Sequence, residues 1–177
     1  MNVYPIEAGN FKLDGGAMFG VVPKSLWTKT NPADADNMIE MSSRCMLVEN
    51  SDKLILVDTG MGDKQSEKFF KYYKRWGSDN LVKSINSAGF SIDDVTDVLL
   101  THLHFDHCGG AVVWDSSKEA YDVLFKNANY WSNENHWDWA TNPNPREKAS
   151  FLDENLFPIK ESGQLKFINS KSKGFNY

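Results

Sequence analysis

Residues 95–110 read VTDVLLTHLHFDHCGG and place three of the chain's four histidines directly after a short, mostly apolar run. The run at 95–100 is bounded by polar residues, which predicts a buried strand. Residues 102–107 therefore begin where a strand ends. This junction between a strand and a polar turn is the feature from which we predict the rest of the fold.

The polar turn carries side chains that bind metals. His102 and His104 are two residues apart, so extended backbone projects both imidazoles to the same side. Asp106 and His107 follow where the chain must turn, and they can converge from another direction. Imidazole and carboxylate together suit zinc, iron or manganese. We expect His102 and His104 to bind one metal, and Asp106 and His107 to bind its neighbour.

Two other interpretations of the cluster are a polar loop with locally bonded histidines and a structural metal site. Structural zinc usually takes four Cys and His ligands, and Cys108 has no CxxC partner here. The pattern therefore favours a metal site of the catalytic type. Gly109 and Gly110 lack side chains, which would let the backbone stay close to the metals.

The composition limits the class of protein. With 177 residues, 41% hydrophobic and 24% charged, the chain is expected to form one globular domain. The longest apolar runs are too short to cross a bilayer, and the first residues resemble no export signal, so we expect a cytoplasmic protein without a membrane partner. The net charge of −5 disfavours nucleic acid. Cys45 and Cys108 are expected to remain thiols.

Upstream of the cluster, residues 1–37 are rich in Gly and Pro and are expected to be mostly loop. Residues 44–50 and 53–60 are apolar runs separated by a polar turn, which predicts a hairpin. Residues 64–76 (KQSEKFFKYYKRW) predict an amphipathic helix. Its aromatic face would be buried, or would belong in part to a subunit contact, and its basic residues would be in solvent: Lys64, Lys68, Lys71 and Arg75.

The remaining elements alternate between helix and strand. We expect a helix at 79–89 that ends at Gly89, and a capping box of Ser91 with Asp94. Strands are predicted at 121–125, 127–131 and 163–170. One helix is predicted at 132–143, capped by Ser132, and another at 144–158 with Pro145 in its first turn. This alternation indicates a mixed α/β fold.

The order of strand, HxHxDH motif and Gly-Gly resembles the metallo-β-lactamase-fold hydrolases, whose metal motif stands here as His102, His104, Asp106 and His107. The stretch LILVDTG at 54–60 is similar to the family's first motif. Residues 15–27 (GGAMFGVVPKSLW) are similar to the start of the lactonase-like branch, the quorum-quenching acyl-homoserine-lactone hydrolases. The resemblance implies an αββα sandwich, of which this chain would hold the N-terminal portion.

The resemblance also implies a mechanism. Two zinc ions, with iron or manganese as alternatives, would lie about 3.5 to 4 Å apart and deliver hydroxide to a small-molecule ester or lactone. Asp106 would hold the second metal and pass a proton to the leaving oxygen. Asp58 would orient the ligands rather than bind metal. The alternative for Asp58 is an Asx-turn with Thr59 and Gly60.

The family takes further ligands from later in its chain: a third histidine, a bridging aspartate and one more histidine. Here only His136 remains, on a predicted helix, and we expect it to be structural or at the surface, next to be a pocket wall, and last to be a metal ligand. We therefore predict one metallo-β-lactamase-like domain at 1–177 that is truncated at its C-terminus. It would associate as a homodimer or through an exposed sheet. The alternative function is a non-catalytic fragment or subunit with an incomplete metal site.

Overall fold

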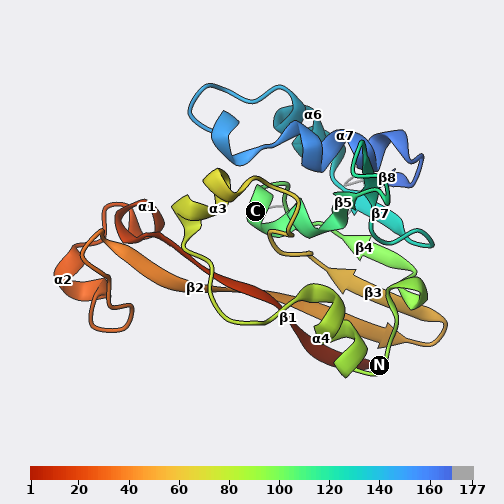
Figure 1. Cartoon of the computed structure of the whole chain (residues 1–177), viewed down its shortest axis with the longest axis horizontal. Helices are drawn as coiled ribbons and strands as arrows, with labels where there is room; N and C mark the ends of the chain where they lie inside the picture. Colours follow the sequence, from red (N-terminus) through yellow and green to blue (C-terminus); the bar gives the residue numbers. More distant parts are fainter. Residues whose placement is uncertain (169–177) are drawn as a thin grey trace, which may run out of the picture.

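The computed structural model describes residues 1–168, and its centre is a sheet of six strands in the order β1-β2-β3-β4-β7-β8 (Figure 1). The pairs β1–β2 and β2–β3 are antiparallel, whereas β3–β4, β4–β7 and β7–β8 are parallel. The strands of this sheet are β1 (Asn2–Asp14), β2 (Met38–Asn50), β3 (Lys53–Val57), β4 (Asp97–Leu99), β7 (Asn129–Ser132) and β8 (Leu165–Phe167). The mixed α/β class is confirmed.

Short helices connect and cover these strands. The two-stranded antiparallel pair β5 (Val112–Trp114) and β6 (Tyr121–Val123) stands apart from the large sheet. The helices are α1 (Gly15–Phe19), α2 (Lys24–Trp27), α3 (Glu67–Tyr73), α4 (Leu81–Ser87), α5 (Phe105–Cys108), α6 (Glu134–Thr141) and α7 (Asp153–Glu161), with 3₁₀ turns η1 (Ile92–Asp94), η2 (Gly109–Ala111) and η3 (Lys148–Ser150). Figure 1 shows α1 and α2 at the far end of the long β1–β2 ribbon, away from the other helices.

The predicted hairpin is present, but its first strand begins earlier than expected. Strand β2 starts at Met38 and pairs along almost the whole of β1. The turn to β3 includes Ser51, whose φ of 55° gives the left-handed conformation needed there. Strand β4 is shorter than the predicted strand at 95–100.

The expectation that residues 1–37 are mostly loop was wrong, because residues 2–14 form β1. Its two buried apolar residues, Ile6 and Phe11, are five positions apart and do not follow an alternating pattern. A shift in the β1–β2 register between Glu7 and Asn10 explains this spacing. Such a bulge adds a residue and reverses the face that later side chains occupy. A search for strict alternation therefore misses this strand.

The predicted helix at 64–76 is shorter than expected. Ser66 caps α3 by accepting from the Phe69 N–H, and Lys74 ends it with a φ of 41°. Lys64 was predicted in solvent, and this was wrong. It precedes the helix, is only 6% exposed, and lies in the loop that passes beneath Gly109.

Two helices of the second half also differ from expectation. Asn133, not Ser132, caps α6, because Ser132 is still part of β7. The predicted helix at 144–158 is divided: η3 ends at Ser150, extended backbone follows, and α7 begins at Asp153. Pro158 is the sixth residue of α7, so its missing N–H removes one hydrogen bond from the middle of the helix. Strand β8 confirms part of the strand predicted at 163–170, whose last two residues lie outside the described residues.

Other predicted features are confirmed. Helix α4 is followed by Gly89 at a φ of 92°. Ser91 and Asp94 form the expected capping box at η1, in which Ser91 N–H donates to the Asp94 carboxylate over 2.7 Å. Cys45 and Cys108 are buried free thiols.

The main hydrophobic core runs between the sheet and the helices and reaches into the histidine turn. Leu103 lies between His102 and His104 and is fully buried, as is Cys108 just after His107. The turn is therefore anchored to the core by Leu103 within it and by Cys108 directly after it. Among residues 1–168, no helix is both long and apolar enough to cross a membrane.

Candidate functional site

The histidine turn lies at the carboxyl ends of two neighbouring parallel strands. Strand β3 runs into Asp58 and strand β4 runs into Thr101, so both residues emerge at one edge of the sheet. The pairing continues for one step beyond the strands, because Asp58 N–H donates to Leu99 C=O over 2.9 Å. Open α/β sheets commonly bind ligands at this edge.

The Asp58 carboxylate reaches across to the turn that follows β4. It accepts hydrogen bonds from Thr101 N–H at 2.9 Å and from Thr101 Oγ1 at 2.8 Å. Its Oδ2 also lies 2.8 Å from His107 Nδ1. The donor of an Asx-turn would be Gly60 N–H, two residues on, whereas the hydrogen bonds of this carboxylate come from Thr101 and His107. The geometry therefore favours an orienting role for Asp58 over the Asx-turn.

Three imidazoles and one carboxylate gather within the turn. The ring centroid of His102 lies 3.9 Å from that of His107 and 4.7 Å from that of His104. His107 Nε2 lies 3.7 Å from Asp106 Oδ2. The Nδ1 atoms of His107 and His102 face Asp58 and Thr101 respectively. The arrangement leaves the Nε2 atoms of both rings for a further partner.

The same proximity controls the charge of the rings. Burial, together with neighbouring His107 and His104, lowers the pKa of His102 to about 4. For His107, burial acts to lower the pKa, but the Asp58 hydrogen bond and the nearby carboxylates outweigh it and the pKa is raised. Burial opposes ionisation of Asp58, yet hydrogen bonds from His107 and Thr101 leave its pKa lowered. Near neutral pH His102 therefore keeps a free lone pair.

Gly109 and Gly110 let two turns cross backbone to backbone. A Cβ on Gly110 would lie 2.2 Å from Thr59 O, and one on Gly109 would lie 2.2 Å from Met61 O. Gly110 N–H also donates to Gly60 C=O over 2.9 Å. The close neighbour that these glycines accommodate is thus the loop after β3, which holds Asp58 in place.

Lys64 supports the far end of the turn from the same loop. Its Nζ donates to Gly109 C=O over 2.5 Å, and its own C=O accepts from Trp114 Nε1 over 3.0 Å. Burial lowers the pKa of Lys64 to about 8. Burial of the ammonium is costly, so Lys64 loses its proton at a lower pH than an ordinary lysine does.

His136 contacts the turn from α6. Its Nε2 accepts a hydrogen bond from Leu103 N–H over 3.0 Å. Its ring also meets Phe151 edge-on at 5.9 Å between centroids, and Phe151 in turn packs against His104 at 4.9 Å. The turn is therefore contacted from two sides, by the loop after β3 and by α6.

Three cavities lie near these elements. A small one of about 150 Å³ adjoins the turn, and its lining includes Phe11, Met41, Asp58, Asp106 and His107. A second, of about 170 Å³, is lined in part by Lys64, Leu81 and Trp114.

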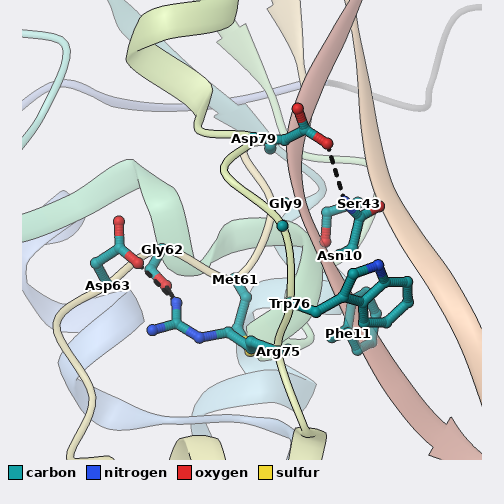
Figure 2. A pocket seen from close by; sticks show the side chains of 12 residues that line it. Gly9, Asn10, Phe11, Ser43, Met61, Gly62, Asp63, Arg75, Trp76 and Asp79 are labelled. Carbon is teal, nitrogen blue, oxygen red and sulfur yellow. Dashed lines mark hydrogen bonds and ion pairs between the residues drawn. The ribbon is translucent and has the colours of Figure 1, made fainter.

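The largest cavity, of about 300 Å³, holds none of the histidines. Its charged side chains are already paired: Arg75 with Asp63 at 2.6 Å, and Asp79 with Asn10 at 2.9 Å (Figure 2). Of the three cavities, the smallest is therefore the one whose lining includes side chains of the histidine turn.

The turn alone does not complete a metal site. Within residues 1–168, no three His, Cys, Asp or Glu side chains are arranged so that they could hold a metal ion. The donor types fit a divalent metal, and the Nε2 atoms of His102 and His107 are left for a further partner, but further ligands are needed.

Comparisons with solved structures identify the fold. A probable metal-dependent hydrolase from Staphylococcus aureus matches with a TM-score of 0.85 and 30% identity, over 94% of this chain and 58% of that one. AidC, a dizinc quorum-quenching lactonase in complex with a product, matches with a TM-score of 0.69 and 25% identity, over 98% of this chain and 60% of that one. The chain thus spans about three fifths of both structures.

Curated relatives are similar over shorter stretches. An N-acyl homoserine lactonase of Bacillus cereus is 31% identical over 84 residues, which is 42% of this chain and 34% of that protein. A probable metallo-hydrolase of Mycobacterium tuberculosis is 31% identical over 108 residues, or 53% of this chain and 35% of that protein. The matched stretches make up about a third of these relatives.

The α/β fold of this chain matches a probable metal-dependent hydrolase, and a curated relative is a probable metallo-hydrolase, so the class is that of the metallo-hydrolases. The chain belongs to the metallo-beta-lactamase superfamily, whose family model matches residues 39–166. The fold class predicted from the sequence is confirmed. The prediction that residues 1–177 are one domain truncated at its C-terminus stays a prediction.

The structure brings together all the predicted site residues: His102, His104, Asp106 and His107 in the turn, and Asp58 beside it. The sequence did not indicate the contacts of Lys64 and His136 with this turn. Both bonds involve backbone atoms, at Gly109 and Leu103, and backbone atoms carry no residue-specific signal.

We predict that Asp58→Asn lowers the pKa of His107, because the ring keeps its burial and loses the charge of its hydrogen-bond partner. The measurement is an NMR titration of the histidine ring protons in the metal-free protein. Asp52→Asn, in the exposed β2–β3 turn, is the control and should leave His107 unchanged. Equal His107 pKa values in the two variants would contradict the orienting role of Asp58.

We predict that Gly110→Ala lowers the free energy of unfolding by about 3 kcal/mol, because the added methyl group meets a backbone oxygen that cannot move aside. Gly16→Ala is the matched control. Its added Cβ would meet only side-chain atoms, Asp14 Oδ1 at 3.0 Å and Asn37 Nδ2 at 3.6 Å, at an exposed position of α1. Urea denaturation of both variants tests the difference, and similar losses would show that the crossing of the two turns is not tightly packed.

Lys64→Met should remove a pH dependence of stability. The pKa of Lys64 is lower in the folded protein, about 8, than the ordinary 10.5, so the folded state binds fewer protons between these values. Wild-type stability therefore gains about 2 kcal/mol relative to the variant between about pH 7.5 and about pH 10. Denaturation at a series of pH values measures this gain. A constant difference between the two proteins would mean that the amine is not buried.

Proposed function

We propose that the protein is a metal-dependent hydrolase that cleaves an ester or lactone bond, in the manner of its lactonase relatives. The observation that carries the proposal is the turn at 102–107, where three imidazoles and a carboxylate gather beside Asp58. The lowered pKa of His102 supports it, since an imidazole binds metal in its neutral form. The family and its dizinc lactonase member add further support.

The proposed ligands are His102 and His104 for one ion, with Asp106 and His107 for a second. Zinc is the first candidate, because AidC, one of the similar structures, is a dizinc lactonase. Iron or manganese would suit the same donors. When bound, the ions would supply an activated water and neutralise the charge that develops on the substrate oxygen. Asp58 would keep the His107 ring turned so that Nε2 faces the metal.

Asp106 would also transfer a proton to the leaving oxygen. Its carboxylate lines the cavity of about 150 Å³ together with His107. This cavity is smaller than a typical ligand pocket, so it would accept the reacting ester group and not a whole substrate. Phe11 and Met41 in the same lining suit an apolar substituent next to that group.

A second candidate function is a non-catalytic fragment or subunit. It is favoured by the absence, within residues 1–168, of a group of three ligands that could hold a metal. In this case the remaining ligands would have to come from another chain or from beyond the described residues. Homodimer formation, association through an exposed sheet, a cytoplasmic location and the lack of a nucleic-acid partner also stay predictions.

Metal content and turnover on the 177-residue chain separate the two candidates. We expect bound zinc and hydrolysis of an N-acyl lactone or a simple aryl ester, and loss of both in His102→Ala. Asp52→Asn should retain both. Trace amounts of metal that are unchanged in His102→Ala would favour the non-catalytic fragment. A zinc-loaded chain that is inert toward lactones, esters and phosphoesters would exclude the hydrolase.

A further inference from the structure

The contact between His136 and Leu103 joins α6 to the middle of the histidine turn. Leu103 N–H donates to His136 Nε2 over 3.0 Å, across 33 residues of sequence. Leu103 separates His102 from His104 and is fully buried. A buried amide that loses its only acceptor carries the whole cost of its desolvation, so this bond holds the backbone in one position.

The position of His136 is itself fixed. Its N–H donates to the Asn133 side chain at the start of α6, over 3.2 Å, and its neighbour Trp137 is buried in the core. The ring packs edge-on against Trp139 and Phe151, each at 5.9 Å between centroids. A rigid acceptor on a packed helix can therefore set the position of the amide that it receives.

The same bond excludes one role for His136. A nitrogen that accepts the Leu103 proton uses its lone pair for that bond, so Nε2 cannot ligate a metal at the same time. The second nitrogen then carries the hydrogen of the neutral ring. Burial and the nearby His104 lower the pKa of His136, which agrees with this neutral form.

We infer that His136 is a positioning residue, which holds the backbone at Leu103 and through it the spacing of the His102 and His104 rings. This inference rests on the proposed function, in which those rings bind metal. Asp58 orients the turn at His107, and His136 does so between the first two histidines. The turn is thus held at two points, Leu103 and His107, by side chains from two different parts of the fold.

The test compares His136→Gln with His136→Leu in the full chain. Gln can present an acceptor oxygen at about the reach of Nε2, whereas Leu fills similar space without one. Amide hydrogen exchange, read by NMR, should show Leu103 protected in the wild type and in His136→Gln, and exchanging at least about tenfold faster in His136→Leu. The amide of Val98 in β4 reports global opening and should be equal in all three proteins.

Unchanged Leu103 protection in His136→Leu would overturn the inference. So would equal loss of protection in both variants, because that result would mean that the ring acts by its shape alone. If His136→Leu does not fold, His136→Asn takes its place, since its oxygen lies too close to the backbone to reach Leu103.

Zinc affinity gives a second readout. It should weaken about tenfold in His136→Leu and stay close to the wild-type value in His136→Gln. If no protein of the series binds zinc, the proposed function fails, and amide exchange still decides the role of His136.

Discussion

The hydrogen bond between the Asp58 carboxylate and His107 Nδ1 is the interaction on which the candidate site depends. It forms only because β3 and β4 are parallel neighbours whose carboxyl ends meet at the same edge. Asp58 has a φ of 59°, an unfavourable conformation for a residue with a side chain. Three hydrogen bonds that Thr101 donates to its carboxylate, and one contact with His107, hold the residue in this conformation. Local strain is thus balanced by contacts to the turn that it orients.

Around this bond, two turns support one another through their backbones. The absence of side chains at Gly109 and Gly110 allows the loop after β3 to pass within reach of the histidine turn. Lys64 then closes the far side by donating to Gly109 C=O. In sites of this kind, how firmly the side chains are held before a ligand binds matters more than how many of them there are.

Much of the fold and most of the candidate site could be predicted from the sequence. The ordering of strand, HxHxDH and Gly-Gly is a local pattern, and together with LILVDTG it indicated the family and placed Asp58 close to the histidine turn. The parallel pairing of β3 with β4 was not predicted. Strand β1 could not be predicted, because its bulge breaks the alternation on which the prediction depends. The division of 144–158 was missed as well, since helix propensity alone does not show that Phe151 must reach into the core beside His104.

The contacts that were missed at the site have a common cause. Lys64 and His136 both bond to main-chain atoms, so nothing in the partner's side chain indicates the pairing. In sequence, Lys64 belongs to a basic, amphipathic stretch and therefore resembles a surface residue. The fold shows that this stretch begins beneath Gly109, where Lys64 is buried. Tertiary structure decides the burial of Lys64. The helical pattern of the residues after it predicted a position in solvent, and Lys64 is buried.

The crossing of the two turns also has a consequence for how the site is assembled during folding. The histidine motif is compact in sequence, yet its supports come from residues 49, 45 and 33 positions away, at Asp58, Lys64 and His136. Closing such loops is slow compared with local helix formation. A peptide of residues 95–110 would contain every histidine of the motif and lack the contacts from Asp58, Lys64 and His136. Ordering of these rings is therefore a property of the whole folded unit and not of the motif alone.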